Sequence, residues 1–352
     1  MIINNVLSLF DGPSITRLSL DRAGIKYKKY YSSEIDKYAL KIAKKNYPDT
    51  VFLGDIEKWK QWDLKNIDLI VGGSPCQGFS FAGKQLNFSD PRSKLFFTFS
   101  DIVKKYKPKY FLLENVRMKK EYQDIITENL GVKPVLINSS LVSAQCRDRL
   151  YWCNWNVSQP KDKGIILEDI IDEGIVNRKK SFCICANYHK GTTVKEYFTK
   201  NRRQLIFCVG SAKKIKDNKY KNIKQGDRIY DISGKSPTLN ANNGNSSGGS
   251  VLIYMKSRGN NKGGIRAKNG KTPSLTANSW QENNFLLSID GYRKLTPVEC
   301  ERLQTLPDNY TSGVSNTQRY KMLGNGFTAD VIAHLFLCMS KKIKIEYQQE
   351  MF

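Results

Sequence analysis

The first 155 residues alternate between short strand-like segments and longer segments with helical periodicity. The strand-like segments are rich in apolar, β-branched and aromatic residues, and they span 5–10, 29–36, 50–55, 67–75 and 109–116. The helical segments lie between them, at 15–25, 37–48 and 92–108. Strands separated by helices are typical of a doubly wound sheet with right-handed crossovers. The pattern therefore predicts an α/β fold with a mostly parallel sheet.

Each of the predicted strands ends in polar residues or glycines. They are Asp11–Gly12, Glu34, Asp55, Gly72–Gly73 and Glu114–Asn115. In open parallel sheets, ligands bind in the crevice outside the carboxyl ends of the strands. The series therefore predicts a single active site at one edge of the sheet.

The pattern changes from residue 161, where helical periodicity fades and Gly, Asn, Ser and Lys become dominant. Two similar segments, GKSPTLNA at 234–241 and GKTPSLTA at 270–277, form an internal repeat with an offset of 36 residues. Turn residues followed by strand formers predict a smaller, irregular, β-rich domain. The repeat is either a duplicated DNA-reading hairpin or a purely structural repeat, and the sequence leaves both open.

Helical periodicity returns after residue 289. Thr296, Pro297 and Glu299 have the spacing of a capping box with proline at the first helical position. A last amphipathic helix spans 327–344 and could pack back on the first domain. We expect a catalytic, cofactor-binding domain at 1–160, a second domain at 161–288, and a segment at 289–352 that returns to the first.

The formal net charge of +24 favours a polyanionic partner, because basic residues that neutralise phosphates release condensed counterions. An AT-rich genome, which would inflate Lys, Asn and Ile, is an alternative source of this excess. Charge by itself therefore only favours a nucleic acid.

Cysteine and histidine usage argues against a metal centre. The eight cysteines show no paired metal-ligand spacing, and the chain has only two histidines. We therefore expect no metal and no Ser-His-Asp triad. The sequence also lacks a signal-peptide pattern and an apolar run near the ~18 residues of a membrane span, so we expect a cytoplasmic protein without a membrane partner.

The segment GGSPCQGFS places Cys76 directly after a predicted strand. A cysteine in such a position is either buried and inert or an activated nucleophile. Gly72, Gly73 and Gly78 would allow a ligand or another backbone to come close. The sequence around Cys76 alone does not decide between the two interpretations.

Two further segments place charged residues near the same edge. The strand ending in ENV carries Glu114, either into the crevice or as a helix cap. In AQCRDRLYW, the residues Gln145, Arg147 and Arg149 alternate along a predicted strand, so we expect all three on one face. An arginine pair there could hold phosphates or a carboxylate, or could lie on a solvated strand edge.

Taken together, these motifs resemble those of the DNA (cytosine-5) methyltransferase family. The matching segments, in the order of the family, are GGSPCQGFS, ENV, QCRDR, RKLTPVECERLQ and MLGNGFTADVI. The resemblance covers residues 5–155 and 290–340. It implies a Rossmann-like methyltransferase fold with a target-recognition domain between the two matching regions.

The resemblance also implies catalytic roles. Cys76 would be the thiolate that adds to carbon 6 of cytosine, and Glu114 would protonate or hydrogen-bond ring nitrogen 3. Arg147 and Arg149 would hold a nucleotide flipped out of the duplex, and Gln145 would support their loop.

The methyl donor implied by the family is S-adenosylmethionine. The implied cofactor-binding residues are Phe10, Asp11, Gly12, Glu34, Ile35, Asp55, Ile56, Pro75 and Asn325. Glu34 would bind the ribose hydroxyls, and Asp55 with Ile56 would bind the adenine. The chain departs from the family at 13–16, where it reads PSIT and relatives carry additional glycines. A β-branched residue in this loop would be unfavourable wherever φ is positive.

The resulting functional prediction is a site-specific DNA methyltransferase, monomeric, with double-stranded DNA as partner and a cognate restriction enzyme as a candidate partner. The alternatives are a tRNA cytosine-5 methyltransferase, a non-catalytic DNA-binding relative and, as the least favoured, a thymidylate-type enzyme. The long variable segment between the arginine motif and the late helix favours DNA.

Overall fold

The structure is a computed structural model that describes residues 1–74, 91–209, 252–255, 264–266, 285–287 and 289–349. It divides into two compact units. The first comprises Met1–Ile166, Lys180–Gly191 and Thr296–Phe352, and the second comprises Leu167–Lys179 and Thr192–Leu295. The first unit is thus built from three separate stretches of the chain.

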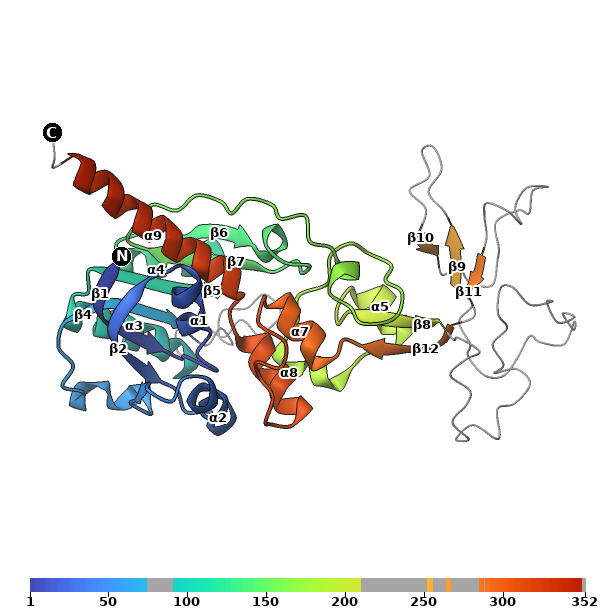
Figure 1. Cartoon of the computed structure of the whole chain (residues 1–352), viewed down its shortest axis with the longest axis horizontal. Coiled ribbons are helices and arrows are strands. Elements are labelled where there is room, and N and C mark those ends of the chain that lie inside the picture. Colours follow the sequence, from blue (N-terminus) through green and yellow to red (C-terminus); the bar gives the residue numbers. More distant parts are fainter. Residues whose placement is uncertain (75–90, 210–251, 256–263, 267–284, 288, 350–352) are drawn as a thin grey trace, which may run out of the picture. The chain divides into compact units, whose positions relative to one another are not determined.

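A seven-stranded sheet forms the centre of the first unit, in the order β3-β2-β1-β4-β5-β7-β6 (Figure 1). Its strands are β1 (Ile2–Leu9), β2 (Lys26–Ser33), β3 (Val51–Phe52), β4 (Ile67–Gly73), β5 (Tyr110–Val116), β6 (Val135–Asn138) and β7 (Asp148–Cys153). β7 runs antiparallel to both of its neighbours, and the other pairs are parallel. The predicted mostly parallel α/β sheet is confirmed.

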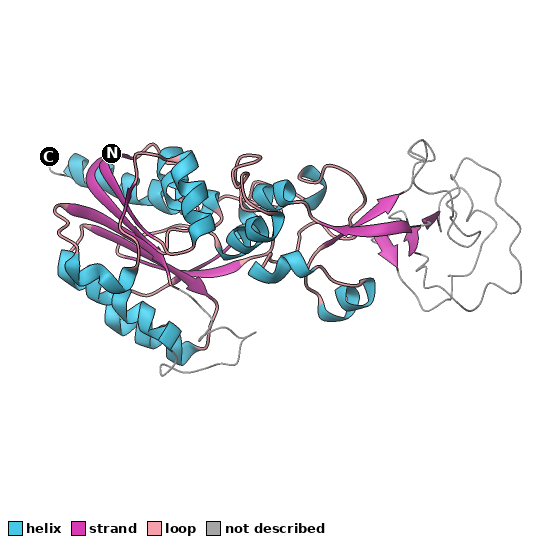
Figure 2. Ribbon diagram, turned by 90° about the horizontal axis from the view of Figure 1, so that it is seen from below, coloured by secondary structure: helices cyan, strands magenta, loops and turns pink. Residues whose placement is uncertain are grey.

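Helices lie on both faces of this sheet (Figure 2). The helices described in the first unit are α1 (Ile15–Arg22), α2 (Lys37–Asn46), α3 (Pro91–Tyr106), α4 (Lys120–Leu130), α7 (Pro297–Leu303), α8 (Asn316–Asn325) and α9 (Ala329–Gln349), and α7 and α8 lie beyond the end of the sheet (Figure 1). Short 3₁₀ segments include η1 (Ile56–Gln61) and η4 (Ala186–Lys190). Buried apolar residues from β1, β4 and α3 form the centre of the core, among them Leu7, Ile70, Phe96 and Phe99.

The predicted strands and helices of the first 116 residues are present, with ends that differ by a few residues. The sequence pattern did not predict α4 or β6. β6 is a four-residue strand at the edge of the sheet, and its Leu136 is 41% exposed. Such a short edge strand leaves little hydrophobic alternation to detect.

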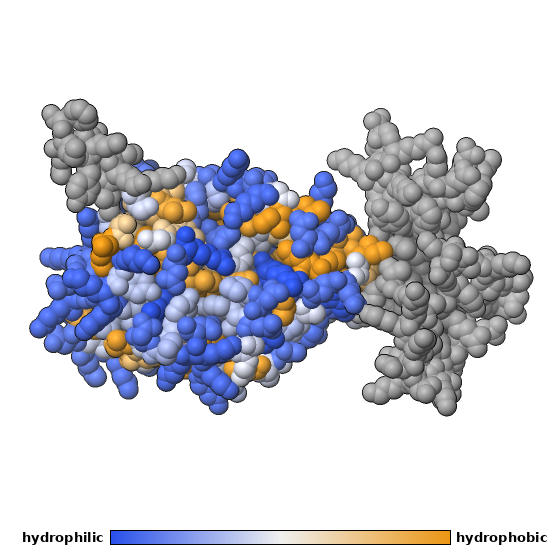
Figure 3. Space-filling view, viewed as in Figure 1, coloured by the Kyte–Doolittle hydropathy of each residue, from blue (hydrophilic) through white to orange (hydrophobic). Residues whose placement is uncertain are grey.

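The C-terminal helix α9 packs against α1. The Ser19 hydroxyl donates to the Ala329 carbonyl at 3.0 Å, and Arg22 pairs with Asp330 at 2.6 Å. By length and composition, the segment Asn316–Ser340 could cross a membrane, but 67% of its most apolar window is buried in the protein. That burial is typical of a core helix. The face of the described residues in Figure 3 is mainly hydrophilic, with smaller apolar areas.

The second unit is β-rich. β8 (Leu205–Val209) pairs with β12 (Ile289–Lys294), and β9 (Leu252–Met255) lies between β10 (Gly264–Arg266) and β11 (Phe285–Leu287), all antiparallel. Among its described residues, the helix α5 (Val194–Lys200) is capped by Thr193. The two copies of the internal repeat lie outside the described residues.

Thr296→Ala should destabilise the first unit by about 1 kcal/mol, because the Thr296 side chain caps α7. Its hydroxyl accepts from the Glu299 N–H at 3.2 Å, while the Glu299 carboxylate accepts from the Thr296 N–H at 2.7 Å. Urea unfolding would measure the difference. Ser315→Ala is the matched control, since Ser315 precedes α8 without a side-chain cap bond. Equal losses in the two variants would contradict the capping argument.

Candidate active site

A cleft of about 650 Å³ lies at the carboxyl ends of the central strands. The predicted site residues that line it are Phe10, Asp11, Gly12, Glu34, Ile35, Asp55, Ile56, Glu114, Arg147, Arg149 and Asn325. Gln145 is buried and does not belong to this lining. Pro75 and Cys76 lie outside the described residues. Parallel strands therefore bring residues from distant parts of the chain to one crevice, as expected for a doubly wound sheet.

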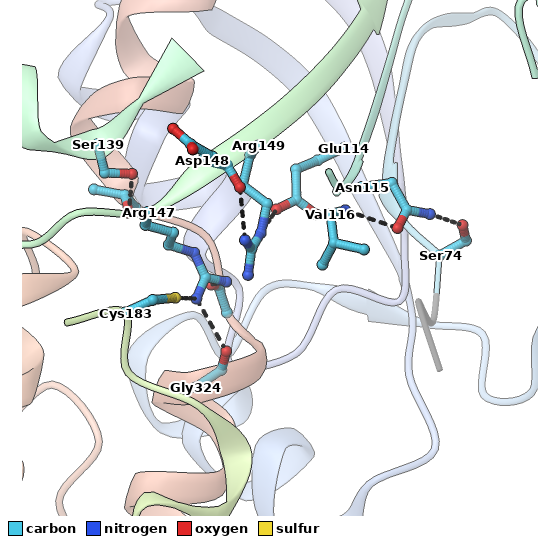
Figure 4. A network of polar contacts seen from close by, with 12 residues as sticks. Ser74, Glu114, Asn115, Val116, Ser139, Arg147, Asp148, Arg149, Cys183 and Gly324 are labelled. Carbon is cyan, nitrogen blue, oxygen red and sulfur yellow. Dashed lines mark hydrogen bonds and ion pairs between the residues drawn. The ribbon is translucent and has the colours of Figure 1, made fainter. Parts of the chain in front are cut away.

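The cleft contains an ion pair between Glu114 and Arg149. Arg149 Nε lies 2.9 Å from Glu114 Oε1, and the two side chains are only 14% and 11% exposed (Figure 4). The pairing arises from the antiparallel register of β5 and β7. Arg149 lies opposite Val116, so Glu114, two residues earlier in β5, is its diagonal neighbour on the same face of the sheet. A carboxylate this enclosed is costly unless it is paired, and the guanidinium supplies the compensating charge.

Asn115 connects the Glu114 strand to the segment that leads to Cys76. Its Nδ2 donates to Ser74 Oγ at 3.1 Å, and its Oδ1 accepts from the Val116 N–H at 2.8 Å. Ser74 is the last residue described before Pro75. The sequence reading placed Asn115 at a strand end but gave it no role. Its sequence signal was its place directly after Glu114 in the ENV motif.

Arg147 turns away from the Glu114 pair and is only 2% exposed. Its guanidinium donates to the carbonyls of Ile184 at 3.3 Å, Gly324 at 3.2 Å and Gly326 at 2.9 Å. It also contacts Cys183 Sγ at 3.4 Å, as Figure 4 shows. Arg147 therefore holds the backbone turn on either side of Asn325.

Gln145 contributes to the same buried region. Its Nε2 donates to the Leu303 carbonyl at 3.0 Å and to Gln304 Oε1 at 3.1 Å. Its Oε1 accepts from the Ile184 N–H at 3.1 Å. Both ends of the amide are thus used to join α7 to the segment before η4.

The prediction that Gln145, Arg147 and Arg149 alternate along one strand face is wrong. β7 begins only at Asp148, and Gln145 makes an isolated bridge to Ser181. The backbone before Asp148 is not extended strand in the sheet, so a period of two does not apply there. The two arginines consequently have different surroundings.

The glycines next to Cys76 make room for side chains of the protein itself. A Cβ on Gly72 would lie 3.0 Å from the Phe99 ring, and one on Gly73 would lie 2.8 Å from the Phe327 ring and 3.3 Å from Glu114 Oε2. We expected these glycines to allow a ligand or another backbone to come close, and in the structure the space at both is taken by aromatic side chains. Gly78 lies outside the described residues.

The loop after β1 contains three residues with positive φ: Phe10 at 56°, Gly12 at 58° and Ser14 at 61°. The β-branched Ile15 begins α1 and does not have to adopt this conformation. Where relatives have additional glycines, the unfavourable backbone conformation thus falls on a serine. The Ser14 hydroxyl donates to Asp11 Oδ2 at 2.7 Å.

Asp11 lies behind this loop, and its carboxylate accepts from the hydroxyls of Ser8, Ser14 and Tyr30. Burial raises the pKa of Asp11 above its ordinary value, although the three hydroxyls oppose the shift. The buried Asp11 carboxylate therefore holds the loop in place by linking Ser14 to Ser8 and Tyr30 through hydrogen bonds.

Two acidic residues follow neighbouring strands beside the loop. Glu34 Oε2 accepts from the Gly12 N–H at 2.8 Å, and Oε1 accepts from the N–H groups of Ile35 and Asp36 at 2.7 and 2.8 Å. Asp55 caps η1 through the Glu57 N–H. Ile35 is 72% exposed, so it offers an apolar surface beside the two carboxylates.

The seven-stranded sheet with its flanking helices has the Rossmann-like methyltransferase fold. One similar structure is that of the Entamoeba histolytica methyltransferase EhMeth, with a TM-score of 0.61 and 16% identity over 97% of this chain and 99% of that chain. Another is a prophage-encoded E. coli protein described as a DNA modification methyltransferase, with a TM-score of 0.53 and 20% identity over 97% and 99% of the two chains. At these identities the likeness shows the fold alone.

The chain belongs to the C-5 cytosine-specific DNA methylase family, whose sequence profile matches residues 4–341. It is 31% identical to the type II methyltransferase M1.ScrFI of Lactococcus lactis subsp. cremoris, over 93% of this chain and 75% of that protein. It is 27% identical to the type II methyltransferase M.HhaI of Haemophilus parahaemolyticus, over 94% and 92% of the two chains. The predicted family and enzyme class, a DNA cytosine-5 methyltransferase that uses S-adenosylmethionine, are confirmed.

The two arginines should differ in their effect on stability. Arg147→Ala removes a buried donor from the carbonyls of Ile184, Gly324 and Gly326, of which Gly326 keeps a bond from Gln304, so we expect a loss of about 3 kcal/mol. Arg149→Ala leaves the enclosed Glu114 carboxylate without its counter-charge, but water from the cleft can enter the space of the lost guanidinium, so we expect a smaller loss of about 2 kcal/mol. Urea unfolding of both variants would measure the contrast. A larger loss for Arg149→Ala would show that the assignment of the two side chains is reversed.

Proposed function

We propose that this protein is a site-specific DNA methyltransferase that methylates carbon 5 of a flipped-out cytosine through a covalent bond to Cys76. The main support is that one cleft contains both the Glu114–Arg149 pair and the acidic strand ends expected to bind the methyl donor. In the sequence, Cys76 follows Ser74 by two positions, and Ser74 is hydrogen-bonded to Asn115, the neighbour of Glu114.

The chemistry requires a nucleophile and an acid, because carbon 5 of cytosine is a weak nucleophile. The Cys76 thiolate forms a bond to carbon 6, while Glu114, once it has taken up a proton as the base enters the cleft, donates that proton or a hydrogen bond to ring nitrogen 3. Electron density then accumulates at carbon 5, which accepts the methyl group. A water molecule takes the proton from carbon 5 while the carbon–sulfur bond breaks, which regenerates the thiolate, and ring nitrogen 3 returns its proton to Glu114. No metal ion is needed for these steps.

The two arginines contribute differently to this proposal. Arg149 orients Glu114 and supplies a positive charge that faces the flipped nucleotide. Arg147, which was also expected to hold the nucleotide, instead positions the turn around Asn325 through its bonds to Gly324 and Gly326. Gln145 supports the same turn from the side of α7.

The cleft residues fit S-adenosylmethionine, which supplies an activated methyl group when bound. The cleft volume of about 650 Å³ is within the usual range for ligand pockets. A carboxylate has about four acceptor sites, and Glu34 uses three for backbone N–H groups. One site therefore remains for a ribose hydroxyl. Ile35, Asp55 and Ile56 would hold the adenine.

The remaining cofactor contacts come from Phe10, Gly12, Pro75 and Asn325, with Asp11 behind them. We infer that the partner is double-stranded DNA, consistent with the net charge of +24. Target recognition would be the role of the segment 161–288. The enzyme would act as a monomer in the cytoplasm of a bacterial or phage-infected cell, with a cognate restriction enzyme as a candidate partner.

The Cys76 assignment can be tested by trapping the covalent intermediate. On DNA containing 5-fluorocytosine the fluorine cannot leave as a proton does, so we expect an adduct that survives denaturing electrophoresis. Cys76→Ser should abolish it, whereas Cys146→Ser, which alters an exposed thiol in the arginine motif, should retain it. An adduct with Cys76→Ser would refute the assignment. Bisulfite sequencing of DNA from expressing cells, with tRNA tested in parallel, would identify the substrate and the target site.

The donor site can be tested by isothermal titration with S-adenosylmethionine. Wild-type protein should bind it, and Glu34→Ala should bind at least about tenfold more weakly, equivalent to about 1.4 kcal/mol, because the Gly12 N–H and the ribose lose their acceptor. Glu121→Ala, an exposed residue on α4, is the control. Absence of wild-type binding at about 1 mM donor would contradict the proposed cofactor site.

A further inference from the structure

Tyr310 reaches the loop after β1 from a part of the chain almost 300 residues away. Its hydroxyl lies 2.8 Å from the Pro13 carbonyl oxygen and 3.2 Å from the Ser14 carbonyl oxygen. The residue is only 8% exposed, so water does not readily replace these bonds. Neither the motifs nor the proposed catalytic steps give Tyr310 a role.

The two carbonyls belong to the part of the loop that is least favourable for its residues. Ser14 has φ 61° and ψ 40°, a left-handed conformation that costs free energy for a residue with a Cβ. Such a conformation persists only when surrounding contacts determine it. The Ser14 hydroxyl bond to Asp11 holds one side of this segment, and Tyr310 holds the other.

Tyr310 is itself held on both sides along the chain. Glu301 is fully buried, and its carboxylate accepts from the Asn309 N–H at 2.7 Å and from the Thr311 N–H at 2.8 Å. Arg319 pairs with the same carboxylate at 2.8 Å. The backbone on either side of Tyr310 is therefore anchored to one buried charged pair.

The Tyr310 hydroxyl remains a donor under ordinary conditions. Burial raises the pKa of Tyr310 well above its usual value, and the neighbouring Tyr47 and Asp11 raise it further. The phenol therefore stays protonated and can donate to a carbonyl.

From this geometry we propose that Tyr310 is a positioning residue for methyl-donor binding, which holds the Pro13–Ser14 backbone so that the adjoining Phe10–Gly12 segment keeps the shape of the cleft. The inference rests on the proposed function, since it assumes that the donor binds in this cleft. It also explains how a loop with a single glycine can keep three positive φ angles.

The first test is Tyr310→Phe, which removes the hydroxyl and keeps the ring. We expect the Kd for S-adenosylmethionine, measured by titration calorimetry, to rise about tenfold. The KM for the donor should rise in parallel, with kcat within about twofold of wild type. Tyr106→Phe is the matched control, because Tyr106 on α3 also donates to a backbone carbonyl, that of Trp62 at 2.9 Å, and does not line the cleft. Its donor affinity should be unchanged.

The second test places glycine at position 14 in the Tyr310→Phe background. Ser14→Gly removes the cost of the left-handed conformation, so it should recover part of the lost donor affinity. Ser14→Ala removes the same hydroxyl but keeps the Cβ, and it should give no recovery.

Donor binding by Tyr310→Phe equal to wild type would overturn the inference, as would equal effects of glycine and alanine at position 14. A drop in kcat with an unchanged donor KM would also overturn it. These outcomes differ from failure of the proposed function, which would appear as absence of donor binding by the wild-type protein itself.

Discussion

In the first unit, the position of the cleft residues depends on one buried set of hydrogen bonds around the Gly324–Gly326 turn. Arg147 donates to the carbonyls of both glycines, and Gln304 donates to the Leu323 and Gly326 carbonyls. Without water to replace them, these buried acceptors are costly to leave unpaired. These bonds therefore fix the turn after α8 against Arg147 and the rest of the segment that precedes β7.

Close packing reinforces this position. A Cβ on Gly324 would lie 2.2 Å from the backbone of Cys185, and one on Gly326 would lie 2.7 Å from Ile15 Cδ1. The second contact joins the turn directly to the start of α1, behind the loop after β1. The cleft is consequently a composite of the first strands and the last helices, and a change in one part alters the other.

Much of the site could be predicted because parallel strands bring their carboxyl ends to one edge. Glu34 and Asp55 follow strands, and Glu114 lies near the end of one, that were recognisable from their apolar patterns, so their common location followed from the fold class. The arginine motif shows the limit of such reasoning. Its alternating spacing suggested one shared face, but the strand begins at Asp148, and the partners of Arg147 are more than 30 residues away.

The sequence by itself determined what local interactions decide: the strand and helix order, the capping box at Thr296, and the ordered motifs that define the enzyme family. Only the tertiary structure decided which arginine pairs with Glu114, that Ser14 takes the left-handed conformation, and that Tyr310 holds the loop beside it. The physical reason is that capping and periodicity act between near neighbours. The partner of a buried donor, by contrast, is determined by which distant segment packs against it.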